Sequence, residues 1–404
     1  MDNGITLQKP QRLLSLDALR GFDMFWIISG EGIFHGLANV VKDKYHLTQS
    51  TVNWQIATAG APLNIWEALV VGISNQLHHS VWNGFTCYDM IFPLFIFIAG
   101  VSMPYSFGSK LEKGNLPIRI VKGSIYRALL KRTIILILLG MVVNGALQFK
   151  GYELTRFASV LGRIGLSCFF AGLIYLNTQL RGQIIWFVAI LLGYWGAMTC
   201  ISVPHLGAGN LTPEGNLSAY VDRLLLPGKL HRKVYDPEGL LSTIPAVATA
   251  MLGIFTGTFL KYQASNFTMI KKAFFLVIAG SLLVLLGWFW GMVFPINKNM
   301  WTSSFVVYTG GFSVLLFAFF YLIVDALQFQ KWCKPFVWIG TNSILIYMAA
   351  HGLVNFEATS HFLFDGLISF THPIWHAAML WVGVAVIQFA ALYFLFKQKW
   401  FLKI

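Results

Sequence analysis

Apolar stretches of about 20 residues recur along the whole chain and are separated by short polar segments. A helix of that length is about 30 Å long, which matches the hydrocarbon thickness of a bilayer. The pattern therefore predicts an all-α polytopic membrane protein, a single transmembrane domain over residues 1–404 with the lipid bilayer as its surroundings. Ten spans are predicted, at about 14–40, 86–107, 127–148, 157–179, 183–203, 238–260, 273–294, 302–324, 335–354 and 373–396.

Composition supports this class: 56% of the 404 residues are hydrophobic and 11% are charged. A soluble domain carries about twice that charged fraction. The net charge of +13 is explained by Lys and Arg in cytoplasmic loops, so we expect no nucleic-acid partner. The four cysteines have no metal-like spacing, and no metal is expected.

The distribution of basic residues predicts the orientation. An even number of spans places both termini on one side, and "KLEKGNLPIRIVKGSIYR" (110–127) and the tail "KQKWFLKI" are rich in Lys and Arg. We therefore predict that both termini are cytoplasmic, although the segment 204–237 is also basic. That segment and 41–80 are predicted as larger outside loops, and long loops are often functional.

Charged residues inside the spans are functional candidates because a charge at membrane depth is costly. Glu31 has no basic neighbour in the sequence; if it is buried it can exchange protons near neutrality, and otherwise it faces the outside loop. Arg127, Lys131, Arg132 and Arg163 are predicted to form a basic wall for the phosphates of an anionic cofactor. Lys131 is also explained by the general excess of Lys and Arg in cytoplasmic loops.

A polar cluster, "HHSVWNG" (78–84), precedes Asp89 and the apolar run 91–101. A histidine near an interface is more often passive than catalytic, but a carboxylate such as Asp89 can orient an imidazole for acid–base or nucleophilic chemistry. The chain has no nucleophile elbow, P-loop, HExxH or CxxC motif. The pattern alone indicates a polar site at the mouth of a helix.

Several longer motifs carry a family resemblance: "RLLSLDALRGFDM" (12–24), "WNGFTCYDMIFPLFIFIAGVSM" (82–103), "AYVDRLLLP" (219–227), "YDPEGLLSTIPAVATAMLGIFTG" (235–257), "FPINKNMW" (294–301) and "TNSILIY" (341–347). In these blocks the chain resembles the heparan-α-glucosaminide N-acetyltransferase family. The resemblance implies transfer of acetyl groups from cytoplasmic acetyl-CoA to the amine of a glucosamine residue across the membrane, with a homodimer as a possible assembly.

The resemblance also implies roles for particular residues. His79, three residues before Trp-Asn-Gly, matches the family's active-site histidine. Arg132, Arg163, Asn342 and Ser343 match family positions and are assigned to acetyl-CoA. Glu31 lies at or beside the position of a family asparagine and is an inferred catalytic partner. The family's lumenal domain is missing, which favours a bacterial inner membrane over a lysosome.

Two chemical routes remain open at His79, because a histidine can act as the general base for attack by the amine or as a nucleophile. Trp301 has an alternative interpretation as part of the aromatic belt. The competing functions are an amino-sugar transporter and an O-acyltransferase of an envelope polysaccharide. The residues predicted to bind the acceptor sugar are Trp82, Asn83, Asp222, Asp236, Glu238, Asn297, Asn299 and Trp301.

Overall fold

A computed structural model of the chain describes residues 13–112, 117–263 and 267–402. Within these ranges the chain forms helices and loops, and strand pairing is limited to three isolated bridges. The all-α class is confirmed. Parts of the predicted cytoplasmic segments, namely 1–12, 113–116 and 403–404, lie outside the described residues.

The helices have the following bounds: α1 Leu14–Phe25, α2 Glu31–Lys44, α3 Ile65–Gln76, α4 Ile91–Glu112, α5 Ile118–Val143, α6 Val160–Asn177, α7 Leu180–Cys200, α8 Leu217–Leu225, α9 Thr243–Lys261, α10 Met269–Gly291, α11 Ser303–Phe320, α12 Lys334–Thr341, α13 Ser343–Met348, α14 Phe356–Ile368 and α15 His376–Lys397. Three π-helical turns interrupt or extend them: η1 Trp26–Gly30, η5 Tyr321–Ala326 and η6 Ala349–Leu353. Through η1, α1 and α2 form one stretch of 31 residues, Leu14–Lys44.

Eight helices among the described residues are long and apolar enough to cross a membrane, and a ninth span results if a pair bent by 75°, Lys334–Thr341 with Ser343–Leu353, is counted as one. The ten predicted spans fall on these eight helices, on the bent pair and on α5. The predicted span 127–148 falls on α5, whose first fifteen residues include five basic ones. α5 therefore differs from the other long helices in the number of charged residues in its first half.

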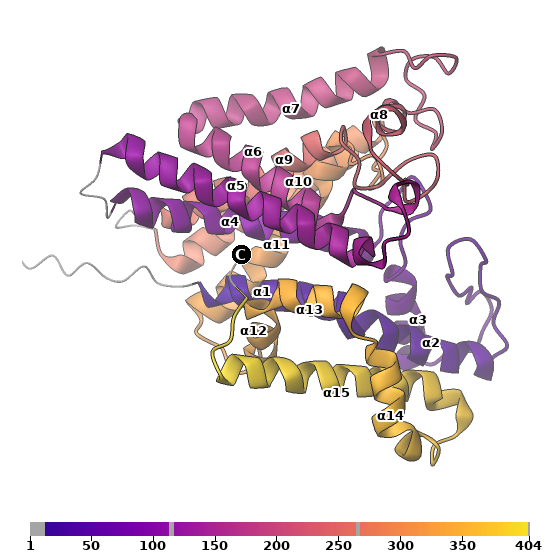
Figure 1. The fold of residues 1–404 in the computed structure, drawn as a ribbon. Helices are drawn as coiled ribbons and strands as arrows, with labels where there is room; N and C mark the ends of the chain where they lie inside the picture. The colour runs from indigo at the N-terminus through magenta and orange to yellow at the C-terminus, as the bar shows by residue number, and fades with distance from the viewer. Residues whose placement is uncertain (1–12, 113–116, 264–266, 403–404) are drawn as a thin grey trace, which may run out of the picture.

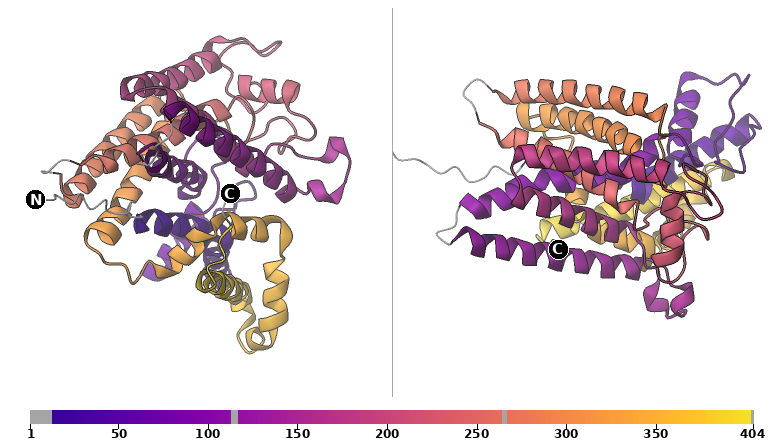
Figure 2. Two further views of the ribbon diagram at one scale, coloured as in Figure 1. Left: turned by 60° about the vertical axis from the view of Figure 1, so that its left-hand side comes forward. Right: turned by 90° about the horizontal axis from the view of Figure 1, so that it is seen from above.

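The long helices run roughly parallel, and the loops gather with α3 and α8 at one end of the bundle (Figures 1 and 2). We call this the loop end. Both predicted outside loops, 41–80 and 204–237, lie there, but each contains a helix, α3 and α8. α1 begins and α15 ends at the opposite end (Figure 1). The membrane side that each end faces stays a prediction.

One of the close helix contacts in the core lies between α4 and α9. A Cβ atom added to Gly100 would be 2.1 Å from the carbonyl oxygen of Ala250, and one added to Gly253 would be 2.1 Å from that of Phe97. The two backbones are therefore in direct contact. Small residues of this kind replace the hydrophobic effect as the basis of helix association in membranes. The contact fixes α4, whose first turn belongs to the candidate site.

We predict that Gly253→Ile lowers the thermal stability of the purified protein, because the new side chain must push α4 away from α9. Overpacking of this kind costs about 1–3 kcal/mol or more. The control is Gly193→Ile on α7, where no heavy atom lies within 4 Å of an added Cβ. Equal melting temperatures for the two variants in detergent would contradict the close contact.

Candidate active site

His79 and Asp89 form a hydrogen-bonded pair at the loop end. Asp89 lies in a short turn, Cys87–Met90, directly before α4, and its carboxylate is fully buried. Its Oδ1 is 2.8 Å from His79 Nδ1, and its Oδ2 accepts hydrogen bonds from the Ser80 amide and from the amide and hydroxyl of Thr86. These donors offset the cost of burying the carboxylate.

The pair has a direct chemical consequence for the imidazole. Because Asp89 is an acceptor, His79 donates through Nδ1, and its Nε2 then carries the lone pair. About half of the His79 side chain is exposed, 51% against 1% for Asp89. The neighbouring His78 is placed differently: its ring stacks on His35, with centroids 4.1 Å apart, and burial lowers the pKa of His78 to about 4.

Lys298 is the residue of this cluster that sequence reasoning missed. Its Nζ lies 3.0 Å from Nδ1 and 3.3 Å from Nε2 of His79, and 3.5 Å from Asp89 Oδ1. Burial lowers the pKa of Lys298, and the charge of Asp89 opposes that shift. Lys298 lies between Asn297 and Asn299, both of which the sequence analysis assigned to sugar binding.

The loop that carries Lys298 is fastened to the Trp-Asn-Gly turn. Asn297 Nδ2 donates to Asn83 Oδ1 at 3.0 Å, and its Oδ1 accepts from the Met300 amide. The Gly84 amide donates to the Ile296 carbonyl at 2.9 Å. The side chain of Asn297 is therefore buried and engaged within the protein, and its role in sugar binding stays a prediction. Asn299 is half-buried.

Trp301 and Arg163 pack against each other behind this loop. Trp301 is buried, donates through Nε1 to Thr249, and lies 4.9 Å from the guanidinium of Arg163. Arg163 is itself buried and donates to Ser242 Oγ and the Gly239 carbonyl. Trp301 is therefore enclosed by the protein, whereas Arg163 keeps two buried nitrogens, Nε and Nη1, without a hydrogen-bond partner among the described residues. The ligand-binding roles of both residues stay predictions.

The other predicted cofactor residues are separated from Arg163. Arg127 and Lys131 are exposed on α5, and Arg132 is half-buried with its Nε buried and unpartnered within the described ranges. Asn342 donates to the Trp400 carbonyl at 2.9 Å and accepts from the Leu402 amide, so its side chain fixes the chain after α15. Ser343, the next residue, is buried.

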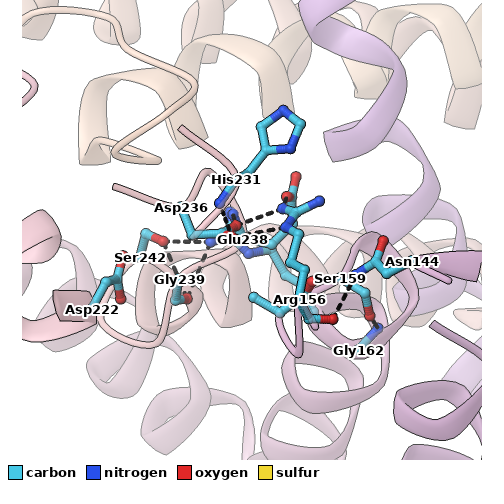
Figure 3. A network of polar contacts seen from close by, with 12 residues as sticks. Asn144, Arg156, Ser159, Gly162, Asp222, His231, Asp236, Glu238, Gly239 and Ser242 are labelled. Carbon is cyan, nitrogen blue, oxygen red and sulfur yellow. Dashed lines mark hydrogen bonds and ion pairs between the residues drawn. The ribbon is translucent and has the colours of Figure 1, made fainter. Parts of the chain in front are cut away.

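A buried ion cluster lies beside the site (Figure 3). Arg156 binds Asp236 through two hydrogen bonds, of 2.8 and 2.5 Å, and also pairs with Glu238. Burial alone would raise the pKa of Asp236, but the hydrogen bonds and charge of Arg156 outweigh it and lower that pKa. Two backbone amides also donate to the carboxylate of Asp236, so its contacts lie within the protein, and its role in sugar binding stays a prediction.

Asp222 and Trp82, which were also predicted to bind the acceptor sugar, make contacts inside the protein. Asp222 accepts from the Leu240 amide, while its Oδ2 is buried and has no hydrogen-bond partner among the described residues. Burial raises the pKa of Asp222 to about 7. Trp82 donates to the Leu211 carbonyl and packs edge-on against Tyr235. Asn83 is exposed but is held by Asn297.

A cavity of about 200 Å³ adjoins the His79–Asp89 pair. Its polar wall consists of His79, Tyr88, Glu238, Lys298, Tyr347 and His351, and apolar residues from α1, η1, α4, α6 and α13 complete it. Glu31 stands behind Tyr88, which donates to it through its hydroxyl. His35 Nε2 is 3.4 Å from Glu31. Glu31 thus has partners on two segments, Tyr88 and His35, and its catalytic role stays a prediction.

The reactive groups thus come from three separate segments, namely 79–91, 294–302 and α13 with the π turn η6 that follows it. No group of three or more His, Cys, Asp or Glu side chains in the described ranges is arranged to hold a metal ion. The cluster can orient a neutral imidazole, place a cation next to it and enclose a small apolar group. This combination suits proton transfer or acyl transfer.

We predict that Asp222→Asn flattens the dependence of stability on pH between about 4 and 7. The pKa of Asp222 is raised in the folded protein, so the folded state holds this proton more tightly than the unfolded state does. The resulting stabilisation is present at low pH and is lost as pH rises through about 7. Melting temperatures measured across this range, with Asp43→Asn as an exposed control, test the assignment; an unchanged slope would contradict it.

Comparison with known proteins gives two related sequences, and no family model matches the chain. Heparan-alpha-glucosaminide N-acetyltransferase from Mus musculus is 28% identical over 81% of this chain and 56% of its own length. The protein of the same name from Homo sapiens is also 28% identical, over 81% of this chain and 55% of its own length. The chain thus spans about half the length of the curated relatives it matches. Over about four-fifths of its sequence, the chain is thus similar to these two heparan-alpha-glucosaminide N-acetyltransferases.

Proposed function

We propose that this membrane protein transfers acetyl groups from cytoplasmic acetyl-CoA to the amine of a glucosamine-type sugar on the opposite side of the membrane. The observation that carries the proposal is the His79–Asp89 pair with Lys298 at the wall of a cavity. The relatives are named as N-acetyltransferases of a glucosaminide. The proposed setting is a bacterial inner membrane, with a homodimer as the proposed assembly.

The reaction requires one proton acceptor on the sugar side. The amine of glucosamine is an ammonium ion in neutral water and must lose a proton before its lone pair can attack. The C–N bond then forms, the C–S bond of the thioester breaks, and the leaving thiolate takes up a proton. His79 Nε2 is placed to receive the proton of the amine, or to attack the thioester first and form an acetyl-imidazole.

Asp89 and Lys298 have complementary roles in this scheme. Asp89 holds the imidazole in the tautomer with the lone pair on Nε2 and stabilises the imidazolium that forms. Lys298 places a positive charge at the cavity wall, where the thioester oxygen becomes negative in the tetrahedral intermediate. Glu31 acts through Tyr88, whose ring centroid lies 4.7 Å from that of His79.

The cytoplasmic donor needs basic groups for its phosphates. Arg127 and Lys131 are exposed on α5, and the buried, unpartnered Nε of Arg132 offers a hydrogen-bond donor further along the same helix. Charge-assisted hydrogen bonds to phosphate are among the strong ones in proteins. We therefore assign the nucleotide of acetyl-CoA to α5, with Asn342 and Ser343 retained only as residues of the helix break.

We predict that His79→Ala abolishes acetyl transfer by the purified protein, with a loss of at least about 10²–10⁴-fold, as expected for a general base or nucleophile. The assay measures N-acetylglucosamine formed from acetyl-CoA and glucosamine. The control is His78→Ala, which removes a neighbouring imidazole that does not contact Asp89 through its ring.

The same preparation separates the competing functions. Sugar uptake into liposomes without acetyl-CoA, together with no acetylation, would show a transporter, and acetylation of a sugar hydroxyl in preference to the amine would show an O-acyltransferase. Acetyl-enzyme trapped after incubation with acetyl-CoA alone would favour the nucleophilic route. Transfer that occurs only when both substrates are present, without such a species, would favour general-base catalysis.

We predict that Lys298→Met lowers kcat by about 10²–10³-fold, the usual effect of removing one group that stabilises an oxyanion, with little change in the KM for acetyl-CoA. Lys298→Arg should retain more activity than Lys298→Met because it keeps the positive charge. Lys150→Met, at an exposed loop position, is the matched control. A variant with Met at 298 and normal kcat would exclude this role.

A further inference from the structure

A second cavity, of about 510 Å³, adjoins the first one. The two cavities share Ile27 of η1 and His351 of η6. The other walls of the second cavity come from the segment 350–357, between α13 and α14, and from Trp381, Val384 and Gln388 of α15. A ligand in this second cavity therefore lies next to the wall that carries His79, Tyr88 and Lys298.

Gln388 presents an unsatisfied acceptor to this space. The residue is 1% exposed, and its Nε2 donates to the Ile28 carbonyl at 3.2 Å. Its Oε1 is buried and has no hydrogen-bond partner among the described residues. A buried acceptor without a partner costs about 1–3 kcal/mol. A ligand with an O–H or N–H group in the cavity removes that cost.

Two other polar side chains of the cavity, Glu357 and His351, also offer hydrogen-bond acceptors. Glu357 has an exposed carboxylate, and no ion pair involves it in the described part of the chain. His351 lies with Nδ1 3.1 Å from the Tyr347 carbonyl, so Nδ1 donates and Nε2 is left as an acceptor. Both residues line the cavity. The lining therefore suits a ligand rich in donors and positively charged.

Trp381 adds an aromatic surface in a fixed position. A Cβ atom added to Gly32 would lie 2.0 Å from the indole ring, so the glycine allows the ring to pack directly on α2. The side chain of Trp381 is only partly buried. An aromatic face beside hydrogen-bonding groups suits a sugar ring, whose faces carry C–H groups and whose rim carries hydroxyls.

We propose that this second cavity binds the amino-sugar acceptor, with Trp381 against the ring, Gln388 Oε1 accepting from a hydroxyl and Glu357 holding the ammonium group. The proposal rests on the function proposed above and places its acceptor on a different set of residues from the one predicted by sequence. Asp236, Asn297 and Trp301, which the sequence favoured, are engaged inside the protein. The amine must then leave Glu357 and pass the shared residues His351 and Ile27 to reach the cavity of His79.

The test is equilibrium binding of glucosamine to the full-length protein, measured by saturation-transfer NMR without acetyl-CoA, with glucose as the uncharged comparison. Glu357→Gln should weaken glucosamine binding about tenfold, which corresponds to about 1.4 kcal/mol, and leave glucose binding unchanged. Trp381→Ala should weaken both sugars, and Trp381→Phe should restore part of the affinity. Glu153→Gln and Trp288→Ala, both at exposed positions outside the cavity, should change neither.

The outcomes for the subsite and for acetyl transfer are separable. Unchanged glucosamine affinity in both Glu357→Gln and Trp381→Ala, or no binding by the wild-type protein, overturns the subsite even if the enzyme acetylates glucosamine. Binding that depends on Glu357 and Trp381, without any acetyl transfer by the wild-type protein, supports the subsite and overturns the proposed reaction. Where transfer occurs, the two variants should raise the KM for glucosamine and leave that for acetyl-CoA unchanged.

Discussion

The burial of one carboxylate, that of Asp89, determines how the loop end is built. A carboxylate with no exposure must have all its acceptor positions filled, because an unsatisfied buried charge is far more costly than the hydrogen bonds are worth. The segment 79–86 therefore folds back over the start of α4 and supplies three donors, and Lys298 approaches from a distant loop. The imidazole of His79 is oriented as a result of that requirement.

Behind this centre, a second layer of charges is structural. Arg156 neutralises Asp236 and Glu238, and Arg163 packs between Trp301 and Ser242. Buried ion pairs contribute little net stability, but breaking one leaves an uncompensated charge and is strongly destabilising. These contacts hold 236–242 and 294–302 in register, so that Glu238 and Lys298 reach the cavity from opposite segments.

The hydrophobic pattern predicted the fold class and eight of the spanning helices because a long apolar run has few alternatives to a membrane helix. The predicted span 127–148 begins within the basic part of α5, ahead of its apolar half. The pattern also did not reveal the 75° bend at Asn342. His79 and Asp89 are ten residues apart, within reach of a loop and a helix start, whereas Lys298 is 219 residues from His79. No local pattern encodes that contact, nor does one distinguish a polar side chain that binds a ligand from one, such as Asp236, that is paired inside the protein.

Two of the three π turns, η1 and η6, border both cavities. Irregular backbone at membrane depth is tolerated only where it is enclosed by protein or lines a cavity, and π turns recur at functional sites. Ile27 lies in η1 and His351 in η6, and these two residues form the junction of the cavities. In Figure 1, α1, α13 and α15 lie on one side of the bundle and α4, α5 and α6 on the other. The proposed reaction joins a donor and an acceptor that approach from opposite ends of the bundle, and residues shared by two neighbouring cavities suit the place where they meet.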